Sequence, residues 1–154
     1  MRRLADLLYH VALTLWVGGL WVTGLVVAPV LFASLGGNRP LAGQLAGRLF
    51  EVMGWLGLAC VSYLLLFVLL RTGSAAWRRW TLWLLLLMLL LTLVSLFGIQ
   101  PLLAQLKADA LPREVMESVL RDRFATWHGV SSLLYLVQCL LGLGLVAACA
   151  GGAR

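Results

Sequence analysis

Long uncharged stretches divide this chain into four apolar segments. They lie between the charged residues Asp6 and Arg39, Glu51 and Arg71, Arg79 and Lys107, and Arg123 and Arg154. A helix needs roughly 20 apolar residues to cross the hydrocarbon core of a bilayer, and each stretch is long enough for one crossing. Helices satisfy their own backbone hydrogen bonds in lipid, and the stretches lack the alternation of a membrane β-barrel. The pattern therefore predicts four transmembrane helices.

The predicted fold class is all-α, an integral membrane four-helix bundle formed by a single transmembrane domain, residues 1–154. We expect the spans at about residues 7–33, 45–70, 78–103 and 124–150. Pro29 is expected to kink or end the first span, and the third is expected to end near Gln100 and Pro101, because proline interrupts helical hydrogen bonding. The short connector after the second span makes spans two and three antiparallel neighbours.

The longest connector, Lys107–Arg123, alternates basic and acidic residues. Pro112 suits the first position of a helix, and an apolar stripe at helical spacing follows it, formed by Val115, Met116, Val119 and Leu120. We therefore expect a short amphipathic surface helix between spans three and four.

Composition agrees with a membrane protein: of 154 residues, 62% are hydrophobic and 12% are charged. The formal net charge of +6 does not indicate a nucleic-acid partner, because no aqueous domain carries a basic patch. Arginines instead cluster at span ends, beside Trp77, Trp80 and Trp83 at the start of the third span, as in an interfacial belt. The expected partner is the lipid bilayer, with a second copy or another membrane protein as possible additions.

An even number of spans places both termini on one side of the membrane. Lys and Arg divide equally between the two sides, six each, so the positive-inside rule gives a tie. Arg2 and Arg3 precede the first span, which usually dominates orientation. We therefore expect a multi-pass protein of the bacterial inner (cytoplasmic) membrane with both termini in the cytoplasm.

Small residues recur at helical spacing and predict close packing of helices, since they let backbones approach in a membrane. The candidate packing residues are Gly18, Gly43, Gly47 and Gly54.

Polar residues form a stripe along the fourth span, at spacings of three and four residues. The candidate ligand site consists of His128, Ser131, Tyr135 and Gln138, with Ser132 and Cys139 beside them and Glu51 from the second span. A weaker stripe on the first span holds the secondary candidates His10 and Thr14, with Gly18 and Trp21; the third span offers Thr92, Ser95 and Gln100. These faces are expected to point into the bundle. They would either line a ligand, ion or haem site or simply form hydrogen bonds between helices.

The two histidines are not expected to share a metal. Spans one and four must be antiparallel, so His10 and His128 lie near opposite interfaces, differing in depth by roughly 15 Å in a core about 30 Å thick. Each could act alone: His10 beside Asp6, one turn earlier, and His128 beside Glu51. If His128 and Glu51 are in contact, Glu51→Gln and His128→Ala should be less than additive.

No phosphate-binding loop, metalloprotease motif or nucleophile elbow occurs in the chain, so no catalytic residue is assigned. The leading interpretation is a structural, interaction or accessory membrane protein without a predicted cofactor. The alternatives are a haem- or metal-handling protein, with haem b as the cofactor, and a small proton or ion pathway that uses Glu51 and His128.

Three motifs resemble the transmembrane-protein-205-like family of small membrane proteins. They are His10 followed by Leu15-Trp-Val-Gly-Gly-Leu20 and Val27-Ala-Pro-Val-Leu-Phe32, the stretch Ala42–Phe50, and Trp127-His-Gly-Val-Ser131. The resemblance covers nearly the whole chain and implies four helices in a membrane, but no established reaction. In the last motif, Tyr135 stands near the place where the family commonly has Asn. A looser similarity connects the chain to the copper-resistance-D and protoporphyrinogen-oxidase-like families of haem-handling membrane proteins.

Overall fold

The computed structural model describes residues 2–110 and 118–151, all in helices apart from short turns. The first long helical segment consists of α1 (Arg2–Val22), the π-helical η1 (Thr23–Val27) and α2 (Ala28–Ser34). The second is α3 (Arg39–Thr72), followed by the 3₁₀ helix η2 (Gly73–Arg78). The third consists of α4 (Trp80–Leu93), the π-helical η3 (Val94–Ile99) and α5 (Gln100–Ala110), and the fourth is α6 (Ser118–Gly151).

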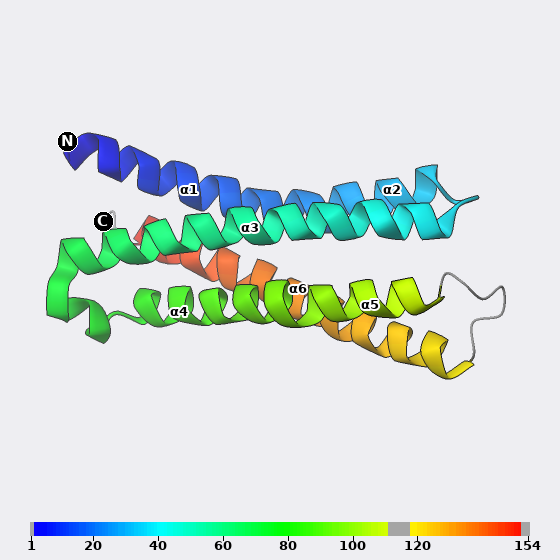
Figure 1. Ribbon diagram of the computed structural model, residues 1–154. Helices are drawn as coiled ribbons and strands as arrows, with labels where there is room; N and C mark the ends of the chain where they lie inside the picture. Colours follow the sequence, from blue (N-terminus) through cyan, green and yellow to red (C-terminus); the bar gives the residue numbers. More distant parts are fainter. Residues whose placement is uncertain (1, 111–117, 152–154) are drawn as a thin grey trace.

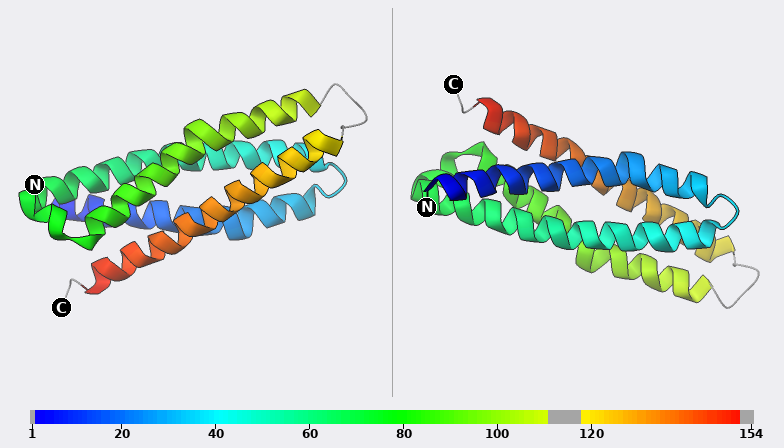
Figure 2. Two further views of the ribbon diagram at one scale, coloured as in Figure 1. Left: turned by 90° about the horizontal axis from the view of Figure 1, so that it is seen from below. Right: turned by 90° about the horizontal axis from the view of Figure 1, so that it is seen from above.

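The four segments form an antiparallel bundle (Figures 1 and 2). Around the bundle, α1 packs against α3, α3 against α4, α4 against α6, and α6 against α1. The N-terminus and the C-terminal end of α6 lie at the same end, while the α2–α3 turn and the end of α5 lie at the other (Figure 1). We call these the terminal end and the turn end of the bundle.

All four segments are long and apolar enough to cross a membrane. The spans run over Arg3–Ser34, Pro40–Arg78, Trp80–Leu106 and Asp122–Cys149. Their outer surface carries more large apolar side chains than the surface of a soluble protein exposes to water. Examples are Val52, Leu70 and Leu133, which are 64%, 78% and 62% exposed. By length and composition this is a multi-pass membrane protein, as the sequence predicts.

The helices do not end at the prolines of the first and third spans, although the sequence predicts that the third ends near Gln100 and Pro101. The chain continues helically through Pro29 to Ser34 and through Pro101 to Ala110. In both cases a π-helical segment ends two residues before the proline: η1 before Pro29 and η3 before Pro101. Because proline offers no N–H to the preceding turn, widening that turn absorbs the missing hydrogen bond without ending the helix.

The connections between spans follow from local chemistry. Asn38 begins α3 as its N-cap, accepting a hydrogen bond from the backbone N–H of Leu41 at 3.2 Å. Gly73 adopts φ 53° where α3 turns into η2, a conformation that disfavours a side chain. The centre of the predicted surface helix, residues 111–117, lies outside the described residues; its flanks, 107–110 and 118–123, belong to α5 and α6.

Glycines make close contacts between helices at the predicted position Gly54 and also at Gly57. A Cβ at Gly54 would lie 2.8 Å from Leu96 Cδ1, and one at Gly57 would lie 2.5 Å from Trp16 Nε1. At Gly18 and Gly43 an added Cβ would meet no neighbouring atom within 4 Å, so these two positions leave room for a side chain, and close packing there stays a prediction. Spacing alone does not show which side of a helix faces a neighbour.

Candidate functional site

A cavity of about 820 Å³ occupies the turn-end half of the bundle, between all four segments. Its lining runs from buried residues near mid-bundle, such as Trp16 and Cys139, to exposed residues at the turn end, such as Pro40 and Gln44. This volume lies within the range of small-molecule sites, and the lining is mostly apolar with a few polar groups, as in such sites. The cavity is therefore the candidate functional site.

The polar stripe of α6 faces this cavity. Its lining residues on α6 include His128, Ser131, Ser132, Tyr135, Gln138 and Cys139. Thr92 on α4, Ser95 on η3 and Gln100 on α5 line it from the opposite side. The packing candidate Gly47 also lines the cavity, on α3. The structure thus brings together the stripes that the sequence singles out on the third and fourth spans.

Gln138 lies at the buried end of the cavity and is only 6% exposed. Its Nε2 donates to the carbonyl oxygen of Met88 at 3.2 Å and to Oγ1 of Thr92 at 2.8 Å. Thr92 Oγ1 in turn donates to the same Met88 carbonyl at 2.8 Å. Exchanging the amide oxygen and nitrogen would place an oxygen against the carbonyl oxygen of Met88, which favours the orientation described.

The amide oxygen of Gln138 has no hydrogen-bond partner among the described residues. A buried acceptor left unsatisfied costs about 1–3 kcal/mol. In a protein this cost marks the place where a partner belongs, whether a water molecule or a ligand. The amide oxygen of Gln138 is therefore an enclosed acceptor without a donor among the described residues, next to the buried end of the cavity.

Two aromatic side chains connect α1 and η1 with α6 beside the cavity. Tyr135 donates its hydroxyl to the carbonyl oxygen of Leu20 at 2.7 Å, and Trp21 donates Nε1 to the carbonyl oxygen of Cys139 at 3.2 Å. Tyr135 also packs over Gly24, where a Cβ would come within 2.5 Å of its ring. These contacts hold the cavity wall in place without using a charge.

No Asp, Glu, Lys or Arg is among the described residues that line the cavity. The histidine on the cavity wall is His128, which is exposed and stacks on Phe124, with ring centroids 5.8 Å apart.

The predicted contact between His128 and Glu51 is wrong: within the described residues, Glu51 pairs with Arg48 at 3.1 Å on the surface of α3. Glu51 follows Arg48 by three residues, so the helix itself brings the two charges together.

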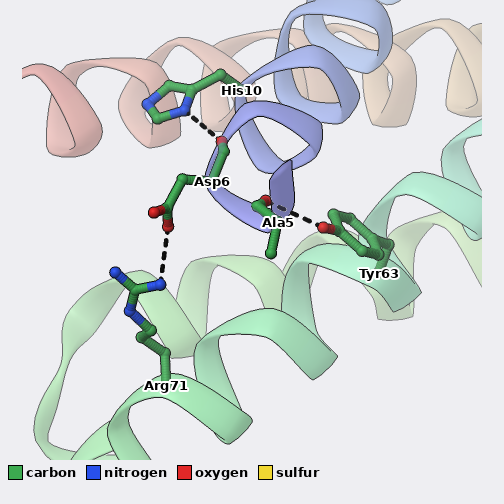
Figure 3. A network of polar contacts seen from close by, with 5 residues as sticks. All are labelled: Ala5, Asp6, His10, Tyr63 and Arg71. Carbon is green, nitrogen blue, oxygen red and sulfur yellow. Dashed lines mark hydrogen bonds and ion pairs between the residues drawn. The ribbon is translucent and has the colours of Figure 1, made fainter. Parts of the chain in front are cut away.

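His10 lies at the terminal end, away from the cavity, in a network that joins the start of α1 to the end of α3 (Figure 3). Its Nδ1–H donates to the backbone carbonyl of Asp6 at 2.7 Å, whereas the Asp6 carboxylate accepts from Arg71 at 2.9 Å. Tyr63 donates to the carbonyl oxygen of Ala5 at 3.1 Å. The expected pairing of His10 with Asp6 is therefore a bond to the backbone.

The predicted inward stripe of the first span is mostly wrong. His10, Thr14 and Gly18 are exposed on the outside of the bundle, and only Trp21 reaches the cavity. The inner face of α1 consists instead of Tyr9, Leu13, Trp16 and Leu20. Here the apolar side chains, which fill volume between helices, determine the orientation of the helix, and the scattered polar residues face outward.

No group of three or more His, Cys, Asp and Glu side chains that could hold a metal ion occurs in the described part of the chain. The histidines lie toward opposite ends of the bundle, His10 in the first part of α1 and His128 in the first part of the antiparallel α6. Cys60, Cys139 and Cys149 are all free thiols.

Sequence reasoning missed the apolar and glycine part of the cavity wall. Trp16, Gly24 and Pro29 line it, and so do residues of both π-helical segments. Pro29 and Pro101 are the signals that could have located these segments, since a proline inside a long apolar span requires a local change in helical hydrogen bonding.

Comparison with known proteins identifies a family without a known activity. The model of a domain of unknown function, DUF4149, matches residues 11–112, which include most of the first three spans but not α6. No curated protein and no solved structure is significantly similar to the chain. The transmembrane-protein-205-like resemblance is not confirmed by this match and stays a prediction. The match covers more than half of the chain, which therefore belongs to the DUF4149 family.

Proposed function

We propose that this protein is a non-enzymatic accessory membrane protein that binds a lipid-soluble small molecule between its helices. The observation that carries the proposal is the cavity of about 820 Å³, whose lining is mostly apolar and whose polar groups are all uncharged apart from the titratable His128. An apolar body would fill the space between the aromatic walls, and the stripe of hydroxyl and amide groups on α6 would orient it.

A photolabelling experiment tests this function. The full-length protein is placed in phosphatidylcholine discs with a dodecanol derivative that carries a diazirine, and labelled residues are mapped by mass spectrometry. We expect saturable labelling of cavity residues on α6, such as Tyr135. Labelling of lipid-facing residues should instead rise linearly with probe concentration.

A matched pair of substitutions on α6 provides the control. Ser131→Trp fills the cavity, because Ser131 lines it, whereas Leu133→Trp adds the same side chain on the lipid-facing side, where Leu133 is 62% exposed. Saturable labelling should fall several-fold in the first variant and persist in the second. Unchanged labelling in Ser131→Trp, or no saturable labelling in the wild type, would contradict the proposal.

Haem is a poorer fit to the same residues. A haem b group carries two propionates and commonly takes a histidine as axial ligand. His128 could supply that ligand, but no Lys or Arg among the described lining residues faces the space to neutralise the propionates. A proton pathway through Glu51 and His128 also loses support, because Glu51 pairs with Arg48 outside the cavity.

We place the protein in the bacterial cytoplasmic membrane with both termini in the cytoplasm. The start of α1 and the end of α6 lie at one end of the bundle (Figure 1). Arg2 and Arg3 stand at the start of the first span, which usually dominates orientation where Lys and Arg otherwise divide equally between the two sides. The cavity would then lie in the half of the bundle away from the cytoplasm. Reporter fusions that are active only on one side of the membrane, attached to the C-terminus, test this orientation.

A further inference from the structure

The cavity is open along one side of the bundle, between the first and fourth segments. The lining residues on α4, η3 and α5 are all partly or fully buried. Exposed lining residues lie on η1, α2 and α6, and they are Leu25, Pro29, Phe32, His128, Ser132 and Leu136. Pro40 and Gln44 add exposed lining in the first turns of α3, at the turn end. The open side therefore follows the edges of η1, α2 and α6 and reaches the turn end.

The packing of the helices explains where this opening begins. Hydrogen bonds from Tyr135 and Trp21 hold α1 and α6 together near mid-bundle. Nearer the turn end, α2 packs against α3, whereas α6 packs against α5. Over the same stretch α2 and α6 diverge (Figures 1 and 2). The opening therefore begins beside Tyr135 and continues to the turn end.

This open side faces the hydrocarbon core of the membrane. Its edges belong to the spans Arg3–Ser34 and Asp122–Cys149, so acyl chains surround them over most of their length. The edges are apolar at Leu25, Phe32 and Leu136, which are 57%, 41% and 47% exposed. No Asp, Glu, Lys or Arg is among the described lining residues, so a charged head group moved inside would lose its hydration without a counter-charge. A ligand from the bilayer must therefore enter with an apolar chain and leave its charge outside.

Resting on the proposed function, we infer that the ligand is a phospholipid of the leaflet at the turn end, with one acyl chain inside the cavity. The chain enters sideways between α2 and α6. Its methyl end lies near Met53 and Leu91, which line the cavity and are partly buried. The charged head group stays at the membrane surface beside the turn end, where the exposed Gln44 lines the cavity. Because the opening reaches the turn end, the chain can enter while the head group remains in water.

Photoreactive phospholipids test this inference in the full-length protein in phosphatidylcholine discs. One phosphatidylcholine carries a diazirine near the methyl end of an acyl chain, a second carries it beside the head group, and labelled residues are mapped by mass spectrometry. We expect the methyl-end probe to label Met53 and Leu91 in the cavity as well as their lipid-facing neighbours Val52 and Leu90, which are 64% and 56% exposed. The head-group probe should label Met53 and Leu91 several-fold less. Methyl-end labelling confined to Val52 and Leu90, or equal labelling of Met53 and Leu91 by both probes, would overturn the inference.

Three tryptophan variants test the sideways entry. Ser132 is exposed and lines the cavity at the opening, so Ser132→Trp should obstruct the chain and lower methyl-end labelling of Met53 several-fold. Leu133→Trp adds the same side chain on the lipid-facing side, and Gln44→Trp adds it at the turn-end edge of the cavity on α3; both should retain the labelling. Labelling that survives Ser132→Trp, or falls equally in Gln44→Trp, would overturn entry between α2 and α6.

The outcomes separate this inference from the proposed function. If the dodecanol probe labels the cavity saturably while the methyl-end phospholipid labels only lipid-facing residues, the cavity binds small molecules but no phospholipid chain. If the dodecanol probe shows no saturable labelling, the proposed function itself is refuted. The comparison of the two phospholipid probes uses the wild-type protein, so it decides the inference even if Ser132→Trp does not fold.

Discussion

Replacing Gly57 by alanine tests how closely α1 and α3 approach. The added Cβ would lie 2.5 Å from Nε1 and 3.2 Å from Cδ1 of Trp16, whose side chain is 1% exposed, so the packed indole would have to shift to make room. Overfilling a packed core costs about 1–3 kcal/mol. The better helix propensity of alanine offsets about 0.5–1 kcal/mol. We therefore expect Gly57→Ala to lower the free energy of unfolding by up to about 2 kcal/mol.

Gly18→Ala is the matched control, because it makes the same change on the exposed side of α1, where no neighbouring atom lies within 4 Å of the new Cβ. Both variants gain similar helix propensity, so the difference between them isolates the steric cost. That difference should be about 1–3 kcal/mol. It is measured by equilibrium unfolding in mixed detergent micelles, followed by tryptophan fluorescence. If Gly57→Ala is as stable as Gly18→Ala, the close approach of α1 to α3 at Trp16 is wrong.

Three further predictions concern polar contacts. The ion pair between Asp6 and Arg71 is 2.9 Å long, but its side chains are 41% and 50% exposed, so a double-mutant cycle should give a coupling of about 0.2–1 kcal/mol. This coupling should shrink as salt is added, and a salt-independent value would contradict the exposed geometry. Tyr135→Phe should lower the free energy of unfolding by about 1 kcal/mol, because it removes a hydroxyl that bonds α6 to α1; unchanged stability in thermal unfolding would rule out that bond. Glu51→Gln and His128→Ala should be additive within about 0.5 kcal/mol, since the two side chains are not paired, and a larger coupling in the unfolding cycle would restore the contact expected from sequence.

The predicted site and the observed cavity agree where a helix has one clear polar stripe in an apolar segment. On α6, His128, Ser131, Tyr135 and Gln138 share one side of the helix by spacing alone, and that side faces the cavity. On α1 the same reasoning fails, because His10 and Thr14 are exposed. A polar residue near a span end can reach the headgroup region, so its presence does not show which side of the helix faces inward.

The amino-acid sequence by itself determined the four membrane-spanning helices, since the separation of charged residues decides which segments can enter lipid. It also determined that the histidines lie apart, because three connections between four spans force spans one and four to run in opposite directions. Only the tertiary structure decided how each helix is rotated about its axis, which depends on the fit of large side chains such as Trp16 into neighbouring helices. The same packing decided that Glu51 stays outside the cavity and that the Gln138 amide oxygen has no donor among the described residues. Those rotations depend on contacts between residues far apart in the chain, which no local pattern specifies.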